Sequence, residues 1–438
     1  MSTDRRPLDP LAGTLRAGGH TPTGVIDDCT DRIDAVEDDV QALVSEPGRE
    51  SRLRREAAAL EARYDEPSTR PPLFGVPVGV KDIFHVDGYR TRAGSAVPSA
   101  TITDAESVAV RRLLDAGALH LGKTHTTEFA YFDPAPTRNP HALDHTPGGS
   151  SSGSAAAVAA GMCPLALGSQ TVGSVIRPAA FCGVVGFKPS HDRIPLDGVV
   201  PFSPTVDHVG TFTADVAGAA RAASVLCDGW EPVDPDDPPI LGVVEGPYLE
   251  QATPAGRAGL DAGADALADA GYEVRRVSML DDIEAVNERH DALTAAELAL
   301  THAERYAEYG EQFADTTADL IEAGREVGVD ELVDARVAAR AFRSRIGERT
   351  REAGVDLLLS PAAPGPAPTG IDDTGDPIMN LPWTHAGVPA LTVPCGRVGS
   401  LPLGLQVVAP FGADEELLSW GAAIASAVAD VGAVDDAT

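Results

Sequence analysis

Residues 146–190 read TPGGSSSGSAAAVAAGMCPLALGSQTVGSVIRPAAFCGVVGFKPS, a run that is poor in charge and rich in glycine, serine and alanine. Such a run is unusual in a chain in which 23% of the residues are charged. It places Ser150 and Ser174 in glycine-flanked loops on either side of a segment of small residues. Glycine beside serine lets the backbone approach a ligand closely and adopt angles closed to other residues. A serine nucleophile surrounded by backbone N–H donors needs that geometry, so the run predicts a catalytic core.

The composition is strongly acidic. The 438 residues are 43% hydrophobic, which is enough for one large core or two modest ones. The net charge is −32, and only three of the 34 basic residues are lysine. This pattern indicates adaptation to a very salty cytosol, where the Debye length is only about 3 Å. The charge therefore says little about partners, although it disfavours a large nucleic-acid-binding face.

The scarcity of lysine makes Lys81, Lys123 and Lys188 informative. Arginine effectively never deprotonates, whereas a buried lysine can lower its pKa and act as a base. All three lysines lie close in sequence to the two serines. We therefore expect at least one of them to take part in chemistry.

The cysteines and the N-terminus bear on the compartment. The five cysteines are scattered, without a CxxC motif or paired spacing, which argues against a disulfide framework or a zinc site and fits a reducing cytosol. The pair Arg5-Arg6 is not followed by an apolar stretch, so it does not indicate a signal peptide. There is also no run of about 18 apolar residues that could span a membrane. We expect a cytoplasmic protein without a metal or cofactor.

Apolar runs alternate with helical segments along most of the chain. Strands are expected at 75–81, 118–121, 164–168, 184–188, 240–244, 356–360, 390–394 and 403–408. Helices are expected at 24–64 (two helices), 103–116 (opened by a capping box, Thr103 to Glu106), 254–271, 282–350 and 413–430. This interleaving indicates an α/β protein with a mixed, largely buried sheet.

Residues 117–124, GALHLGKT, match the phosphate-binding pattern GxxxxGK[ST]. That mechanism requires a strand before the motif and a helix after it. Here a helix precedes the motif, and its interior letters resemble a strand. We expect Gly117 to end the helix and residues 118–122 to begin a strand, without ATP or GTP binding.

Several spaced motifs, taken together, resemble the amidase signature family. In chain order they are GVKD (79–82), GKT with EFA (122–130), GGSSSGS (148–154), GSQTVGSVIRPA (168–179), GVVGFKP (183–189), GVPA with VPCG (387–396) and PLGLQ (402–406). The resemblance implies one amidase-signature domain over 1–438, with a mixed, twisted β-sheet core flanked by helices on both faces. Its catalytic core would cover about 70–215 and 355–430. N-terminal helices would occupy about 10–65, and a variable helical region about 230–350.

The resemblance also implies a Ser–Ser–Lys triad. Ser174 would be the nucleophile, Ser150 the bridging serine after a cis Gly149–Ser150 peptide, and Lys81 the base. The 24-residue separation of the two serines fits the family pattern. Serine is a weak nucleophile until a base takes its proton. A buried, neutral Lys81 could do this through Ser150 and later protonate the departing amine.

The same resemblance places the oxyanion hole in the loop that ends at the nucleophile. One backbone donor in such a hole is often worth about 3 kcal/mol. The donors would be the backbone N–H groups of Thr171, Val172, Gly173 and Ser174.

Other candidates have less direct roles. Lys188 is expected to hold a loop by hydrogen bonds, and Arg177 to pair with a carboxylate near the nucleophile loop. His141 and His145 suggest a Ser–His alternative, but no GxSxG pattern accompanies them. Candidate substrate-pocket residues are Tyr131, Phe132, Asn380 and Trp383, with Asp376 as a possible contact for a substrate amine.

The departures from the family pattern bear on the type of enzyme. Val172 stands where glycine is common, Gln170 where aspartate is common, and Ile176-Arg177 reverses the order arginine then apolar. Gln170 and the Ile176-Arg177 order differ from the pattern of the A subunit of glutamyl-tRNA amidotransferase and resemble that of stand-alone amidases.

Three functions follow from the resemblance. The first is a free-standing amidase that converts a small carboxamide to carboxylate and ammonia through an acyl-enzyme. The second is the A subunit of a tRNA-dependent amidotransferase, which would supply ammonia to partner subunits. The third is a non-catalytic binding relative, which retention of all three triad residues disfavours. The family likeness suggests a homodimer.

Overall fold

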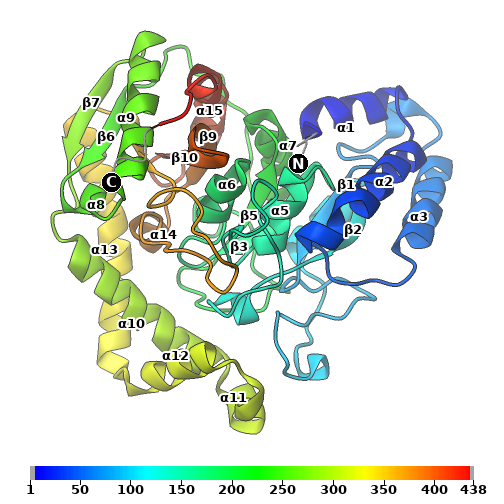
Figure 1. The fold of residues 1–438 in the computed structure, drawn as a ribbon, viewed down its shortest axis with the longest axis horizontal. Coiled ribbons are helices and arrows are strands. Elements are labelled where there is room, and N and C mark those ends of the chain that lie inside the picture. Colours follow the sequence, from blue (N-terminus) through cyan, green and yellow to red (C-terminus); the bar gives the residue numbers. More distant parts are fainter. Residues whose placement is uncertain (1–4, 435–438) are drawn as a thin grey trace.

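The computed structural model describes residues 5–434 and is built on a single ten-stranded sheet (Figure 1). The strand order is β2-β1-β3-β5-β4-β9-β10-β8-β6-β7. The strands are β1 Pro77–Lys81, β2 Leu119–Thr124, β3 Leu165–Gln170, β4 Val185–Lys188, β5 His208–Thr213, β6 Leu241–Glu245, β7 Val274–Ser278, β8 Leu357–Pro361, β9 Ala390–Val398 and β10 Leu401–Val408. Pairs at the two ends of the sheet are parallel, while the pairs from β3 through β5, β4, β9 and β10 to β8 are antiparallel. The sheet is therefore mixed, as the sequence predicts.

Helices surround the sheet and extend from it. They are α1 Leu8–Ala17, α2 Pro22–Val40, α3 Arg49–Arg63, α4 Val108–Asp115, α5 Ser152–Ala159, α6 Ile176–Cys182, α7 Val216–Leu226, α8 Pro247–Glu250, α9 Pro254–Asp269, α10 Ile283–Thr301, α11 Ala303–Tyr309, α12 Asp315–Glu326, α13 Val329–Ala353, α14 Leu381–Ala386 and α15 Asp414–Val428. Short 3₁₀ turns lie at Pro67–Thr69, Ser99–Thr101, Glu128–Ala130 and Gly310–Gln312. Helices α10 to α13 form an arm that leaves the sheet region at the lower left of Figure 1.

Helices cover both faces of the sheet. On β9, a side chain added at Gly421 of α15 would meet Leu391, whereas the Thr392 hydroxyl donates to the Ile176 carbonyl of α6. Because successive side chains of a strand point to opposite faces, α15 and α6 lie on opposite sides of the sheet. The predicted fold class, a mixed sheet flanked by helices on both faces, is confirmed.

The small residues of the 146–190 run have a steric role in α5. All eight residues of this helix are buried. A Cβ atom added at Gly153 would lie 2.2 Å from the Ala42 carbonyl oxygen and 2.4 Å from the His125 nitrogen. Only a helix of small side chains can approach its neighbours this closely. The helix also packs against β1 and β3, and Ser150 just before it contacts Lys81 of β1.

The structure corrects one predicted helix start. Residues 103–107 are not helical, and α4 begins at Val108. Glu106 does not cap it; its carboxylate accepts from the Asp87 backbone N–H and pairs with Arg111. The tertiary contact with Asp87 therefore replaces the local capping box.

The phosphate-loop match is a strand, as predicted. Residues Leu119–Thr124 form β2, and Gly117 follows α4 with a φ of 88°. Lys123 is buried, and its Nζ lies 2.9 Å from Asp82 Oδ1 and donates to the Phe84 carbonyl. The lysine of the motif is thus paired within the core.

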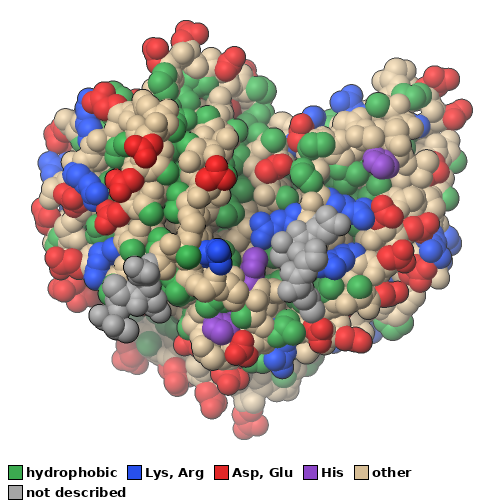
Figure 2. All heavy atoms as spheres, turned by 45° about the horizontal axis from the view of Figure 1, so that its top comes forward, with side chains coloured by type: hydrophobic (Ala, Val, Ile, Leu, Met, Phe, Trp, Pro, Cys, Tyr) green, Lys and Arg blue, Asp and Glu red, His purple; other side chains and the backbone are tan. Residues whose placement is uncertain are grey.

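The surface is acidic, and the face in Figure 2 carries Asp and Glu side chains over most of its outline. Every helix within residues 5–434 is too short or too polar to cross a lipid bilayer.

Candidate active site

Lys81 is at the centre of a buried hydroxyl cluster. It is the last residue of β1 and is fully buried. Its Nζ donates to Ser150 Oγ at 2.7 Å and to Ser169 Oγ at 2.8 Å. Burial holds the pKa of Lys81 well below its usual 10.5, while the buried Asp207 carboxylate acts in the opposite direction. The amine is therefore biased toward its neutral form, in which it can accept a proton.

Ser150 lies just before α5, and the Gly149–Ser150 peptide bond is cis, as the family resemblance implies. Arg177 of α6 holds this peptide: its guanidinium donates to the Gly149 carbonyl at 2.7 Å. It also donates to the Gly375 carbonyl at 2.6 Å and to the Thr374 hydroxyl at 3.2 Å. The prediction that Arg177 pairs with a carboxylate is therefore wrong, because its hydrogen-bond partners are two backbone carbonyls and a hydroxyl. Burial lowers the pKa of Arg177 from 12.5 to about 10.

Ser174 lies in the short loop between β3 and α6 and is 8% exposed. It faces a small cavity whose wall contains both serines and the loop expected to form the oxyanion hole. The lining includes Ser150, Thr171, Val172, Gly173, Ser174, Arg177, Tyr131, Phe132 and Pro377. The structure thus brings the predicted site residues around one cavity, with Lys81 directly behind Ser150.

The unusual Gln170 anchors the Ser174 loop at both ends. Its side-chain oxygen accepts from the backbone N–H groups of Val175 at 2.8 Å and Ile176 at 2.9 Å. Its amide nitrogen donates to the Thr384 hydroxyl at 2.8 Å, and this hydroxyl donates to the Val172 carbonyl at 2.6 Å. A carboxylate could make the first two contacts but could not donate to Thr384.

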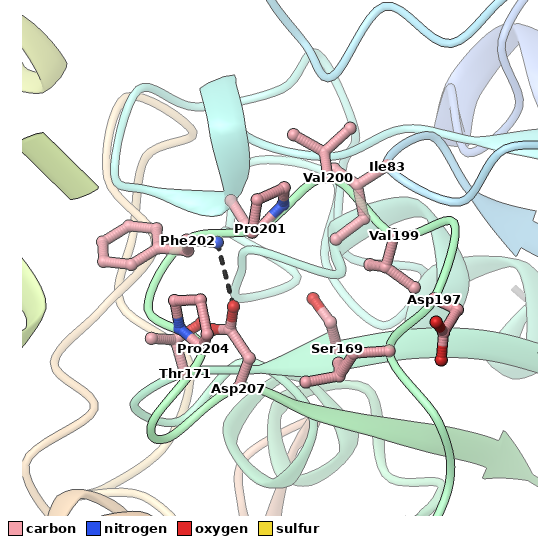
Figure 3. A pocket seen from close by; sticks show the side chains of 12 residues that line it. Ile83, Ser169, Thr171, Asp197, Val199, Val200, Pro201, Phe202, Pro204 and Asp207 are labelled. Atoms are coloured by element: carbon pink, nitrogen blue, oxygen red, sulfur yellow. Dashed lines mark hydrogen bonds between the residues drawn. The ribbon is translucent and has the colours of Figure 1, made fainter. Parts of the chain in front are cut away.

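A second, larger cavity adjoins the first (Figure 3). It has a volume of about 300 Å³, and the two cavities share Ala130, Thr171 and Phe202 as lining residues. The Ser169 hydroxyl points into it, and the opposite wall is apolar (Figure 3). The apolar residues of the lining are Ile83, Leu196, Val199, Val200, Pro201, Phe202 and Pro204, together with Ala130.

Asp207 fixes the boundary between the two cavities. Its carboxylate accepts from the Thr171 hydroxyl at 2.6 Å and from the backbone N–H groups of Phe202 and Ser203 at 2.9 and 3.0 Å. Burial raises the pKa of this carboxyl, and these hydrogen bonds counteract the rise. Asp207 therefore ties the Thr171 side of the loop to the segment that lines the larger cavity.

Several expected site residues lie elsewhere. Trp383 is fully buried and donates to the Tyr248 hydroxyl, so it is a core residue and not a pocket residue. Asn380 is also buried and packs against Gly173. A Cβ atom added at Gly173 would lie 2.5 Å from Asn380 Oδ1. Asp376 is exposed and accepts from the Ile378 backbone N–H. The Asn380 and Trp383 expectations are therefore wrong, because α14 is turned into the core.

The histidines and the third lysine serve the fold. His141 Nε2 lies 3.0 Å from the Cys182 carbonyl oxygen, and His145 Nδ1 lies 2.8 Å from Asp144. Neither histidine lines the cavity at Ser174. Lys188 Nζ donates to the Pro189 and Val388 carbonyls, as expected for a loop-holding residue.

Sequence reasoning missed Ser169, Asp207 and Thr384. Ser169 could have been found, because it lies in the same glycine-flanked run as Ser174. Asp207 and Thr384 carry no local signal, since their role comes from contacts with residues far away in the chain. Within residues 5–434, no group of three or more His, Cys, Asp or Glu side chains is arranged to hold a metal ion.

Comparison with known proteins places this site in a family context. A family model described as Amidase matches residues 24–418. The A subunit of glutamyl-tRNA(Gln) amidotransferase from Synechococcus sp. (strain RCC307) is 33% identical over 468 residues, covering 94% of this chain and 95% of that protein. The AtzE subunit of 1-carboxybiuret hydrolase from Pseudomonas sp. (strain ADP) is 33% identical over 397 residues, covering 82% of this chain and 85% of that protein. A crystal structure of an amidase is similar with a TM-score of 0.86 and 33% identity, covering 97% of this chain and 100% of the other.

Proposed function

The chain belongs to the Amidase family, whose members include hydrolases of carbon–nitrogen bonds, and we propose that it hydrolyses a small-molecule carboxamide through a serine acyl-enzyme. The observation that carries this proposal is the buried Lys81 amine, which contacts Ser150 at 2.7 Å beside the cavity that also contains Ser174. The side chain is poised as a base because burial favours its neutral form.

In the first half of the reaction, Ser174 Oγ attacks the amide carbon. Its proton passes to Ser150 Oγ while the Ser150 proton passes to Lys81 Nζ. The carbonyl oxygen becomes an oxyanion, which the backbone N–H groups of the 171–174 loop are proposed to stabilise. The carbon–nitrogen bond then breaks with its electron pair on nitrogen. The nitrogen takes a proton from Ser150, which regains one from Lys81.

In the second half, water attacks the acyl-enzyme. Lys81, neutral again, accepts one water proton through Ser150 and returns it by the same route to Ser174 Oγ as the acyl–oxygen bond breaks. The acid product then loses its remaining proton to solvent and leaves as the carboxylate. No metal or cofactor is required for either half. Ser169 is proposed to hold Lys81 in place, because its hydroxyl is the second contact of Nζ at 2.8 Å.

The decisive experiment measures release of ammonia or amine at high potassium chloride from aliphatic, aromatic and amino-acid amides, including glutamine. The purified chain alone should turn over at least one simple amide. Ser174→Ala should abolish this turnover while its circular dichroism spectrum remains that of the parent. Full product release by Ser174→Ala would rule out the acyl-enzyme.

A second candidate is the A subunit of a tRNA-dependent amidotransferase. It is favoured by the similarity to the glutamyl-tRNA(Gln) amidotransferase protein, which spans 94% of this chain. In that case hydrolysis would be confined to glutamine and would require added partner subunits. Gln170 and the reversed Ile176-Arg177 order support the stand-alone enzyme instead.

The acidic composition supports a salty cytosol as the working environment. With a net charge of −32, mutual repulsion on the folded surface is expected to be relieved by screening. We therefore propose that activity and stability both require high salt. The homodimer, the cytoplasmic location and the division into a core and a variable region stay predictions.

A further inference from the structure

The larger cavity is too big for an ammonia leaving group. Its volume is about 300 Å³, whereas an apolar protein cavity of about 150 Å³ holds benzene. Most of its lining is apolar, with Val199, Val200 and Ile83 facing the Ser169 hydroxyl (Figure 3). A substituted aromatic ring or a short alkyl chain fits such a space.

The position of the cavity relates it to the leaving nitrogen. The Ser169 hydroxyl lines this cavity and accepts from Lys81, which in the proposed mechanism reprotonates Ser150 after Ser150 has given its proton to the nitrogen. Thr171, which belongs to the proposed oxyanion loop, lies in the wall shared with the Ser174 cavity. A substituent on the nitrogen could therefore extend past Thr171 while the carbonyl carbon stays at Ser174.

The charges of the two cavities also differ. The charged residue in the lining of the Ser174 cavity is Arg177, whereas those in the lining of the larger cavity are Asp197 and Asp207. Asp197 is exposed, so it lies where the cavity meets solvent. A carboxylate product is favoured beside arginine, and an amine that becomes a cation in water is favoured beside aspartate.

We propose that the larger cavity receives the amine portion of the substrate, which is therefore a secondary amide whose nitrogen carries an apolar group. This inference rests on the proposed amidase function and deepens it. The carbon–nitrogen bond breaks with its electron pair on nitrogen, and the nitrogen takes one proton from Ser150. The neutral primary amine lies in the apolar cavity and takes a further proton from water as it leaves past Asp197.

The first test uses amides that share one acyl group and differ in the leaving amine: ammonia, methylamine, butylamine and benzylamine. The ratio of kcat/KM for the benzylamide to that for the primary amide should exceed one. A ratio far below one, with the primary amide still hydrolysed, would overturn this inference and leave the proposed amidase function in place. If none of these amides were hydrolysed, both the inference about the cavity and the proposed amidase function would be contradicted.

The second test changes the cavity at Val200, which is buried and faces its interior. Val200→Trp should lower the benzylamide to primary-amide ratio by at least about tenfold, because a pocket discriminates even single methylene groups by that factor. Val200→Ala should shift the preference toward larger amines, which keeps the test usable if the tryptophan variant does not fold. Val333→Trp, on the exposed face of α13, is the matched control and should change neither rate.

A third comparison separates the amine side from the acyl side. A series of primary amides of increasing acyl size should respond to Val200→Trp by one common factor. If the variant instead selects against large acyl groups, the cavity holds the acyl portion and the inference is wrong.

Discussion

Gln170 and Thr384 are 214 residues apart in the chain, yet the Gln170 amide donates to the Thr384 hydroxyl at 2.8 Å. The Thr384 hydroxyl in turn donates a hydrogen bond to the Val172 carbonyl at 2.6 Å. A side chain at the end of β3 and one in α14 thus fix the Val172–Gly173 peptide, which lies within the loop that carries Ser174. Because valine stands where glycine is common in the family, this external support restrains a loop that carries a larger side chain.

Thr384→Val tests that support, since valine has nearly the shape of threonine but cannot hydrogen-bond. The Gln170 amide and the Val172 carbonyl would lose their buried partner, which costs about 1–3 kcal/mol of unfolding free energy. We expect kcat to fall about tenfold with little change in KM, because the oxyanion donors are misplaced mainly in the transition state. Thr384→Ser should restore most of the rate. Equal losses in the serine and valine variants would indicate a packing role alone.

Lys81→Arg and Lys81→Ala should both reduce turnover to background. Arginine keeps the positive charge and much of the length but cannot act as a neutral base. Single-turnover measurements on an activated ester should show slow acylation in both variants. Substantial activity in Lys81→Arg would mean that the residue contributes charge or hydrogen bonds and does not transfer protons.

The pH profile of kcat/KM should show an acid limb that belongs to Lys81. Activity requires the neutral amine, so it rises with pH through the pKa of Lys81, which burial holds well below 10.5. The Asp207 carboxylate raises that pKa, so Asp207→Asn should move the midpoint of the limb to lower pH. A midpoint that stays in place or moves upward would exclude Lys81 as the titrating group. Asp376→Asn, at an exposed carboxylate outside both cavities, is the control and should leave the midpoint in place.

Lys188 should make folding stability depend on pH. Burial lowers the pKa of Lys188 from 10.5 to about 7, so between these values the unfolded chain binds more protons at this side chain than the folded protein. The free energy of unfolding that Lys188 contributes therefore rises as pH increases from about 7 toward 10.5. Urea unfolding of the parent and of Lys188→Met at pH 7 and pH 9.5 should show the difference changing in favour of the parent at the higher pH. A difference that is constant with pH would contradict the lowered pKa.

The sequence predicts the buried strands whose residues are mostly apolar. β1 and β3 are buried along their whole length and read as apolar runs. β5 was not predicted because its buried residues include His208 and Thr211, whose polar character hides the strand. β7 lies at the sheet edge and carries two arginines, so its sequence resembles a surface segment.

The site shows the same division between local and tertiary information. Lys81, Ser150 and Ser174 come from motifs that can be recognised in sequence, and the structure places them together. Asn380 and Trp383 were misplaced because the direction in which α14 faces depends on its packing against Tyr248 and Gly173. Asp207 and Thr384 act through hydrogen bonds across the fold, which no local pattern encodes.

The burial of all three lysines has a consequence for handling the protein. Lys81, Lys123 and Lys188 are the only lysines in the chain, and each lies inside the core. Reagents that acylate primary amines, such as N-hydroxysuccinimide esters, should therefore leave these side chains untouched in the folded protein. Dyes, cross-linkers and resins that attach through lysine are poorly suited to it. Conversely, the rate at which an acylating reagent modifies each lysine reports how often that part of the core opens, at the neighbouring strands β1 and β2 for Lys81 and Lys123 and at β4 for Lys188.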